Sequence, residues 1–284
     1  MINTLLKILN IFFIFFLYSY NSAILTKEKL CIVIPAYNEE KRIEYTLETY
    51  ADYFKKADED TTFLVVANNC SDKTVATAFK VAKKHKNIEV INLKPGGKGF
   101  AVKKGFEWAL HKNFDWIGFV DADMATLPQY YYDLFMAAHD HDGAIASRYI
   151  KGAIVTPKRP WLRKIGGKFY NWMLRSLSGL KYKDTQCGAK IFTKDTIEKV
   201  TPLMHEVGWS FDLELLYLCK LFDKDIVEVP TVWSDQPGTH LKISTSLAKE
   251  FLNSPRRIKQ RHKEKKEALK KARQKNKKLM RKKN

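Results

Sequence analysis

The sequence predicts an α/β domain with a mostly parallel sheet and helices on both faces. Short apolar runs alternate with longer amphipathic segments along residues 29–139, which is the spacing of βαβ units. Polar clusters follow the ends of these runs, where parallel sheets place their ligands. The chain has 284 residues, 45% of them hydrophobic, enough for one domain of roughly 200–250 residues plus appendages.

The first half contains four predicted strands, each followed by a predicted helix. The strands are continuous apolar runs, as is typical of strands buried on both faces. They are residues 29–37, 61–68, 87–93 and 115–120. The helices are residues 38–56, 75–85, 99–112 and 127–139.

The second half is less regular. Residues 142–152 predict a strand and a loop, and residues 226–235 predict a late edge strand. Residues 159–180 place aromatic and aliphatic side chains near helical spacing among Lys and Arg. This basic, Trp-containing pattern suits either a membrane surface or an ordinary helix packed on the core.

Residues 4–25 form a candidate membrane segment. They are long and apolar enough to cross a bilayer, although Lys7, Asn10 and Asn21 weaken the pattern. A cleaved signal peptide is the alternative, because Ser22-Ala23 resembles a processing site. We expect a retained single-pass anchor. The Lys and Arg that follow would keep the bulk of the chain cytosolic, at the endoplasmic reticulum membrane in a eukaryote or the cell membrane in a prokaryote.

The positive charge is concentrated at the C-terminus. Residues 255–284 hold 16 Lys and Arg and 2 acidic residues, which is most of the net charge of +19. Without a wide apolar face they predict a solvated helix or tail, with anionic lipid as a second reading. Nucleic-acid binding is less favoured because no aromatic side chain is present for stacking. The predicted divisions are a membrane anchor (1–26), an α/β domain (27–248) and a basic tail (249–284).

Several kinds of site are excluded by pattern. The cysteines are widely spaced and form no CxxC pair, which argues against structural zinc and a disulfide framework. Residues 94–105, KPGGKGFAVKKG, match neither the Walker A loop nor the dinucleotide fingerprint. Their glycines could still let an anion approach the backbone before a helix, with Lys98 adding charge, unless the segment is a plain turn.

Asp121 and Asp123 end the fourth strand. In an extended strand end, residues two apart point to the same side. Two carboxylates plus substrate phosphates are a usual Mg²⁺ or Mn²⁺ site. Taken alone, the pattern is more typical of a polar turn that caps the strand, so the other motifs must decide.

The ordered set of motifs resembles the inverting family 2 glycosyltransferases, and within them the polyprenyl-phosphate sugar synthases. The resemblance covers about residues 29–245. The motifs are PAYNEE (35–40), GGKGFAVKKG (96–105), DADMAT (121–126), SRYIKG (147–152), DTQCGAKIF (184–192) and FDLELLY (211–217).

The resemblance implies a GT-A fold, a nucleotide-sugar donor and Mg²⁺ or Mn²⁺ as cofactor. Pro35, Tyr37, Glu39 and Asn68 would lie at the nucleotide, with Lys98 near the donor. Asp121 would contact ribose or metal, and Asp123 would ligate the metal. Arg148 would face phosphate, and Asp184, Gln186 and Cys187 would border the sugar or acceptor.

One departure concerns the base. Relatives usually carry Asp-Asp after the second strand, whereas this chain has Asn68-Asn69. The choice between UDP and GDP therefore stays open. Ala125-Thr126 follows the form of the lipid-phosphate glucosyltransferases, whereas many mannosyl relatives carry Gln at position 125, so we expect glucose, from UDP-glucose.

The expected reaction is attack by a polyprenyl or dolichyl phosphate on the anomeric carbon, with inversion, at a membrane lipid surface. Such a phosphate needs no strong base, because it is already anionic at neutral pH. The alternative is GDP-mannose as donor, or a glycan or protein hydroxyl as acceptor. A hydroxyl needs a base, for which Asp212 or Glu214 are the candidates unless they only cap a helix.

Overall fold

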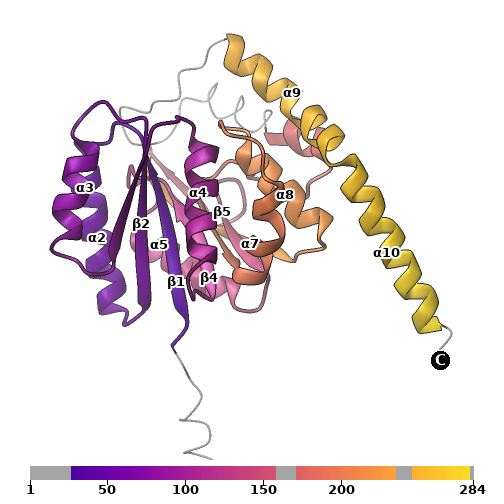
Figure 1. Ribbon diagram of the computed structural model, residues 1–284, viewed down its shortest axis with the longest axis horizontal. Coiled ribbons are helices and arrows are strands. Elements are labelled where there is room, and N and C mark those ends of the chain that lie inside the picture. The colour runs from indigo at the N-terminus through magenta and orange to yellow at the C-terminus, as the bar shows by residue number, and fades with distance from the viewer. Residues whose placement is uncertain (1–26, 158–170, 235–244, 282–284) are drawn as a thin grey trace, which may run out of the picture.

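A computed structural model describes residues 27–157, 171–234 and 245–281. A seven-stranded sheet forms its centre, in the order β3-β2-β1-β4-β7-β5-β8 (Figure 1). The strands are β1 (Lys29–Ala36), β2 (Asp60–Asn68), β3 (Ile88–Leu93), β4 (Trp116–Val120), β5 (Gly143–Ser147), β7 (Ala189–Thr193) and β8 (Ile226–Pro230). The predicted α/β class with a mostly parallel sheet is confirmed.

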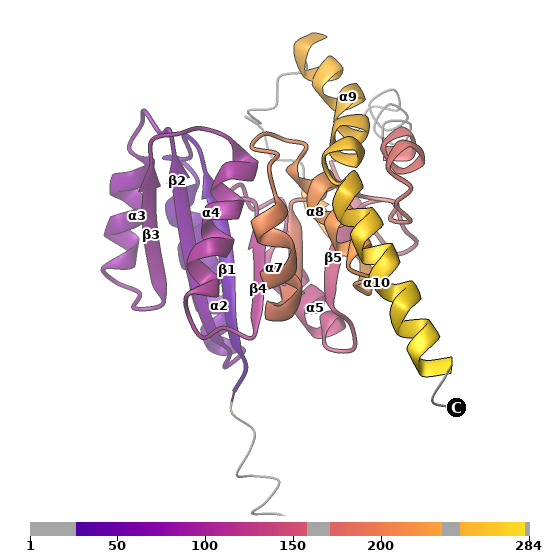
Figure 2. The same ribbon diagram turned by 45° about the vertical axis from the view of Figure 1, so that its right-hand side comes forward.

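Helices cover both faces of the sheet because alternate residues of each strand point to opposite faces. In β1, Leu30, Ile32 and Ile34 pack in one hydrophobic cluster, and Cys31 and Val33 in another. The first cluster includes side chains of α2 (Ile43–Lys56), α3 (Thr74–Ala82) and α5 (Pro128–Ala138). The second includes α4 (Lys98–Leu110), α7 (Lys194–Val200) and α8 (Phe211–Leu221), which lie together on the other face (Figure 2).

Strand order fixes where a ligand can bind. The first three strands run outward from β1 to β3, and β4 then returns to pair with the other side of β1, parallel to it. The carboxyl ends of β1 and β4 therefore flank a topological switch point, the usual ligand crevice of such sheets.

One strand of the sheet was not predicted. β7 pairs antiparallel with both β4 and β5, and it is formed by residues of the DTQCGAKIF motif. Residues 226–230 lie at the sheet edge as β8, as predicted. Beyond Pro230 the chain leaves this sheet, and β9 (Val232–Ser234) pairs with β6 (Ile154–Thr156) in a separate two-stranded sheet.

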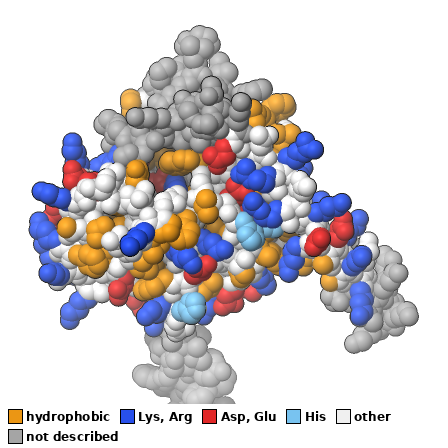
Figure 3. All heavy atoms as spheres, turned by 45° about the horizontal axis from the view of Figure 1, so that its top comes forward, with side chains coloured by type: hydrophobic (Ala, Val, Ile, Leu, Met, Phe, Trp, Pro, Cys, Tyr) orange, Lys and Arg blue, Asp and Glu red, His pale blue; other side chains and the backbone are white. Residues whose placement is uncertain are grey.

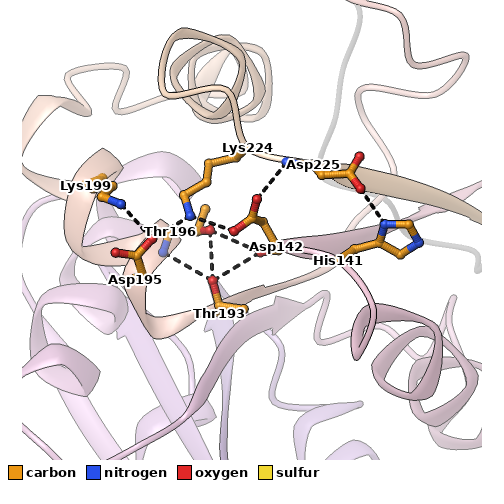
Figure 4. A network of polar contacts seen from close by, with 8 residues as sticks. All are labelled: His141, Asp142, Thr193, Asp195, Thr196, Lys199, Lys224 and Asp225. Atoms are coloured by element: carbon orange, nitrogen blue, oxygen red, sulfur yellow. Dashed lines mark hydrogen bonds and ion pairs between the residues drawn. The ribbon is translucent and has the colours of Figure 1, made fainter. Parts of the chain in front are cut away.

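Ion pairs tie the edge opposite the switch point. Lys224 Nζ lies 2.6 Å from Asp142 Oδ1 and 2.5 Å from Asp195 Oδ2, joining the starts of β8, β5 and α7 (Figure 4). His141 Nδ1 lies 2.7 Å from Asp225 Oδ2 in the same network. These contacts hold the starts of β5, β8 and α7 next to one another.

The described chain continues past residue 248 as two helices, α9 (Thr245–Arg261) and α10 (Lys263–Arg281). Ser254, Ile258 and His262 are buried, so the α9 end of this segment packs on the domain, whereas α10 extends beyond it (Figure 1). Among the residues that the structure describes, no helix combines the length and apolar character needed to cross a bilayer. The predicted anchor, residues 4–25, lies outside them, as do residues 158–170 of the predicted amphipathic stretch; residues 171–178 are helical.

Candidate active site

Asp121 and Asp123 lie at the carboxyl end of β4, beside the switch point. The Asp121 backbone N–H donates to the Gly188 carbonyl at 2.9 Å, and Asp123 Oδ1 accepts from the Ala125 N–H at 3.0 Å. Met124, between the second aspartate and Ala125, has φ 60°, so the chain turns sharply here. Burial, and then the charge of Asp121, raise the pKa of Asp123 to about 6. The negative charge of Asp121 thus disfavours ionisation of Asp123.

Lys98 is the first residue of α4 and lies against this pair. Its Nζ is 2.5 Å from Asp121 Oδ1 and 5.5–6.0 Å from the ring centroids of Trp209, Phe211 and Phe119. Burial alone would lower the pKa of the ammonium, but Asp121 and then Asp212 raise it above its ordinary value. Lys98 is thus a fixed positive charge at the helix N-terminus.

The glycines around Lys98 admit a protein loop. We call residues 204–210, between a short 3-10 helix (Thr201–Leu203) and α8, the α8 loop. A Cβ on Gly97 would lie 2.4 Å from the Val207 carbonyl oxygen, and one on Gly99 would lie 2.3 Å from that of Glu206. The sequence suggested that these glycines let an anion approach; in the structure their nearest neighbours are backbone carbonyls.

The predicted nucleotide-binding residues gather at the ends of β1 and β2. Pro35 is buried within β1, and Tyr37 beyond it is 44% exposed. Glu39 is buried, and its carboxylate is bound by Arg42 at 2.6 and 2.8 Å. Asn68 Nδ2 donates to the Gly97 carbonyl at 2.9 Å, which joins the β2 end to the Lys98 turn. Their roles toward a nucleotide stay predictions.

The Arg148 guanidinium forms an ion pair with Asp184, a residue of another motif. Its Nε lies 2.7 Å from Asp184 Oδ2 and its Nη2 lies 2.9 Å from Asp184 Oδ1, while the guanidinium covers the Trp233 ring at 4.8 Å. Burial would raise the pKa of the Asp184 carboxyl, but Arg148 lowers it below its ordinary value. The structure thus pairs the SRYIKG and DTQCG motifs, and the phosphate role of Arg148 stays a prediction. Gln186, partly exposed, donates its N–H to Asp184 Oδ1 at 3.3 Å.

Asp212 forms a buried ion pair that the sequence analysis missed. Lys190 Nζ, on β7, lies 2.5 Å from Asp212 Oδ1 and 2.6 Å from the Cys187 carbonyl oxygen, and the Lys190 side chain is fully buried. Burial raises the pKa of the Asp212 carboxyl despite the attraction of Lys190 and Lys98. Glu214, the other candidate base, belongs to a separate cluster beside α9. A lysine within a short apolar run, AKIF, was the only signal for this pair.

Two further residues of the site were missed. Trp209 lies beside Lys98, and Gly188 packs directly against Asp121, since a Cβ there would be 1.9 Å from Asp121 Oδ2. Gly188 had no detectable signal beyond its place in a motif. Trp209 precedes FDLELLY and falls in a segment for which no element was predicted.

The oxygen atoms of the two aspartates suit a small divalent cation. Asp121 and Asp123 offer hard carboxylate oxygens, and the close approach of Lys98 shows that Asp121 already faces a cation. Within residues 27–157, 171–234 and 245–281, no group of three or more acidic, His or Cys side chains could hold a metal. Two carboxylates suffice for Mg²⁺ or Mn²⁺ when substrate phosphates complete the shell. The residues present therefore fit the predicted cofactor.

Comparison with known proteins identifies a sequence family for this chain and solved structures with a similar fold. The family described as Glycosyl transferase family 2 matches residues 31–200. A dolichyl-phosphate beta-glucosyltransferase of Trichomonas vaginalis is 34% identical over 226 residues, 75% of this chain and 66% of that protein. Those of Drosophila melanogaster and Homo sapiens are 32% and 31% identical, each over 75% of this chain and over 69% and 70% of their own lengths.

Among solved structures, glucosyl-3-phosphoglycerate synthase from Mycobacterium tuberculosis, in complex with Mn²⁺, UDP-glucose and phosphoglyceric acid, has a similar fold. The TM-score is 0.56 at 15% identity, covering 82% of this chain and 79% of that one. At this identity the likeness concerns the fold alone. The motif resemblance and the family match agree, and the chain belongs to glycosyl transferase family 2.

Proposed function

We propose that this protein transfers glucose from UDP-glucose to a polyprenyl phosphate, dolichyl phosphate in a eukaryote, with inversion at the anomeric carbon. The observation that carries the proposal is the position of Lys98, Asp121 and Asp123 at the β1/β4 switch point. They occur in a chain 31–34% identical to proteins named dolichyl-phosphate beta-glucosyltransferase. Ala125-Thr126 supports glucose as the sugar.

The donor diphosphate would lie between Lys98 and the aspartates. Asp121 and Asp123 would hold Mg²⁺ or Mn²⁺, which when bound neutralises charge on the leaving nucleoside diphosphate. Lys98, at the N-terminus of α4, adds a positive charge on the protein side. When the diphosphate binds, its oxygens would accept hydrogen bonds from Lys98 and partly replace the ion pair of Lys98 with Asp121.

The acceptor phosphate supplies its own nucleophile. One of its oxygens forms the new bond to the anomeric carbon while the bond to the donor phosphate breaks, and the electron pair leaves on the nucleoside diphosphate. Since the acceptor is already anionic at neutral pH, no proton has to be removed. The burial of Asp212 against Lys190 supports this reading over a hydroxyl acceptor, because the predicted base is engaged in an ion pair.

The surface around the site suits a lipid acceptor. Figure 3, turned so that the top of Figure 1 comes forward, shows hydrophobic, basic and acidic side chains interspersed on the described surface. Val207 of the α8 loop is 56% exposed and Leu252 of α9 is 52% exposed. Apolar and basic side chains together favour an anionic membrane surface. We place the enzyme at a membrane, with its catalytic domain on the cytosolic side.

The test is transfer of label from a panel of radiolabelled nucleotide sugars into extracted polyprenyl phosphate. UDP-glucose should give a glucolipid, and Asp123→Ala and chelator should each abolish it. Label from GDP-mannose alone, or transfer to a glycan hydroxyl without any lipid product, would contradict the proposal. Full activity of Asp123→Ala in chelator would exclude the metal role.

A further inference from the structure

The α8 loop is packed between the candidate donor site and helix α9. On one side it contacts the start of α4, where Gly97 and Gly99 leave room for it and the Phe100 N–H donates to the Val207 carbonyl at 3.1 Å. Trp209 of the same loop lies 5.5 Å from Lys98 Nζ. A displacement of this loop would therefore change the surroundings of Lys98 directly.

On the other side, α9 binds the loop through Glu206. Arg257 Nε and Arg261 Nη1 lie 2.9 and 2.7 Å from Glu206 Oε1, and Arg257 Nη2 also contacts Glu206 Oε2. The Glu206 side chain is only 5% exposed, so these charged hydrogen bonds are shielded from water on one side. Two guanidinium groups on one buried carboxylate make a directional connection.

Glu214 reinforces the same connection from α8. Its Oε2 accepts the backbone N–H groups of His205 and Glu206 at 2.6 Å each. Its Oε1 is 3.0 Å from Arg261 Nη1 and 2.8 Å from His262 Nε2. Glu206 and Glu214 therefore both hold the first half of the α8 loop in place. The cations that pair with these two carboxylates come from α9.

We infer that α9 is part of the catalytic apparatus. Arg257 and Arg261 are positioning residues that hold Glu206, and through it the α8 loop, so that Lys98 and Trp209 are set for the donor. The inference rests on the proposed function for the identity of that donor. It gives the beginning of the basic C-terminal segment a role in nucleotide-sugar binding, beyond solubility or attraction to lipid.

The experiment compares Arg257→Gln/Arg261→Gln with Arg273→Gln in the full-length protein. Arg273 is the matched control because it also joins the C-terminal helices to the domain, through Asp223 at 2.6 Å, but at the far end of α8. Two measurements are made: steady-state kinetics with UDP-glucose, and hydrogen–deuterium exchange of peptides covering residues 96–104 and 203–211.

The double variant should raise KM for UDP-glucose about tenfold or more and speed exchange in both peptides. Arg273→Gln should change neither. Arg257→Lys/Arg261→Lys, which keeps the charge but loses the forked geometry, should fall between them; it also serves as the test if the Gln pair does not fold. Unaltered exchange and KM in the folded charge-removed variant would overturn the inference.

The two proposals fail in different ways. If the wild-type protein does not use UDP-glucose, the proposed donor is wrong, while faster exchange of residues 96–104 in the double variant would still support the connection from α9. If the wild type is active and the double variant matches Arg273→Gln in both measurements, the positioning role is wrong and the donor assignment stands.

Discussion

At the residue scale, the position of Asp121 depends on Gly188. Replacing Gly188 by Ala would put a Cβ 1.9 Å from Asp121 Oδ2 and 2.3 Å from its Cγ, so the carboxylate must move. A shift of about 1 Å in a positioned group can lower activity about 100-fold. We therefore expect Gly188→Ala to lower kcat/KM for UDP-glucose by about that factor while the protein stays folded.

Gly105→Ala is the control for this substitution. A Cβ at Gly105 would lie 2.4 Å from a Val33 methyl carbon, in the packing between α4 and β1 and away from the aspartates. It should lower Tm without a comparable change in kcat/KM of the folded enzyme. Equal kinetic losses in the two variants would contradict a specific role for Gly188.

The Lys190–Asp212 pair predicts a stability effect. Lys190→Met leaves Asp212 buried without its partner, and breaking a buried pair in this way typically destabilises by about 3–5 kcal/mol. Replacing both residues, in Lys190→Met/Asp212→Leu, should recover most of that loss because no buried charge remains. Urea unfolding of the two variants measures the difference, and equal stabilities would contradict this account of the pair.

The sequence could identify side chains whose chemistry is unusual at a strand end, but not their partners. Asp121, Asp123 and Lys98 were predicted because charges follow apolar runs and because an ordered set of motifs recurs. The pairing of Arg148 with Asp184, and of Asp212 with Lys190, depends on which strands become neighbours. That information is not local to any motif.

At the scale of elements, the contact between α8 and α9 should be pH-dependent. Burial would raise the pKa of Glu214, but hydrogen bonds from His262, from the backbone N–H groups of Glu206 and His205, and from Arg261 lower it below its ordinary value. A group with a depressed pKa in the folded state contributes stability above its unfolded pKa, about 4.3 for Glu. This contribution is lost as pH falls through the folded value.

We therefore expect the wild type to lose stability below about pH 4.3 more steeply than Glu214→Gln. Thermal unfolding between pH 7 and pH 3 would measure this. Asp223→Asn is the control, because Asp223 has an exposed carboxylate that pairs with Arg273 on α10. Parallel pH profiles of Glu214→Gln and the wild type would show that Glu214 makes no such contribution.

The parallel strands were predictable and β7 was not, for two physical reasons. Strands buried on both faces read as continuous apolar runs, as in residues 29–37 and 61–68. β7 carries a buried lysine in its five residues, which interrupts its apolar pattern. It also runs against its neighbours, so the βαβ alternation that located the other strands gives no place for it.

At the scale of the whole molecule, the two C-terminal helices should differ in importance. The contacts of α10 with the domain involve Arg273 with Leu221 and Asp223, and Lys265 over the Phe222 ring, all remote from the α8 loop. Removing residues 263–284 should leave KM for UDP-glucose within about twofold. Removing residues 249–284, which takes away Arg257 and Arg261, should raise it as in the double variant. Equal effects of the two truncations would contradict this division.

The direction of β1 also constrains how the enzyme could lie on a bilayer. The described chain enters β1 at Lys29, and Tyr37 follows the eight-residue strand at the opposite edge, roughly 26 Å away at 3.3 Å per residue. An anchor preceding Lys27 would thus enter the domain at the edge farthest from the donor site (Figure 1). For anchor and site to reach the same lipid surface, the strands must lie along the membrane plane rather than upright on it. The anchor would then hold the domain with its strands parallel to the membrane, so that the lipid substrate approaches the site from the side of the domain.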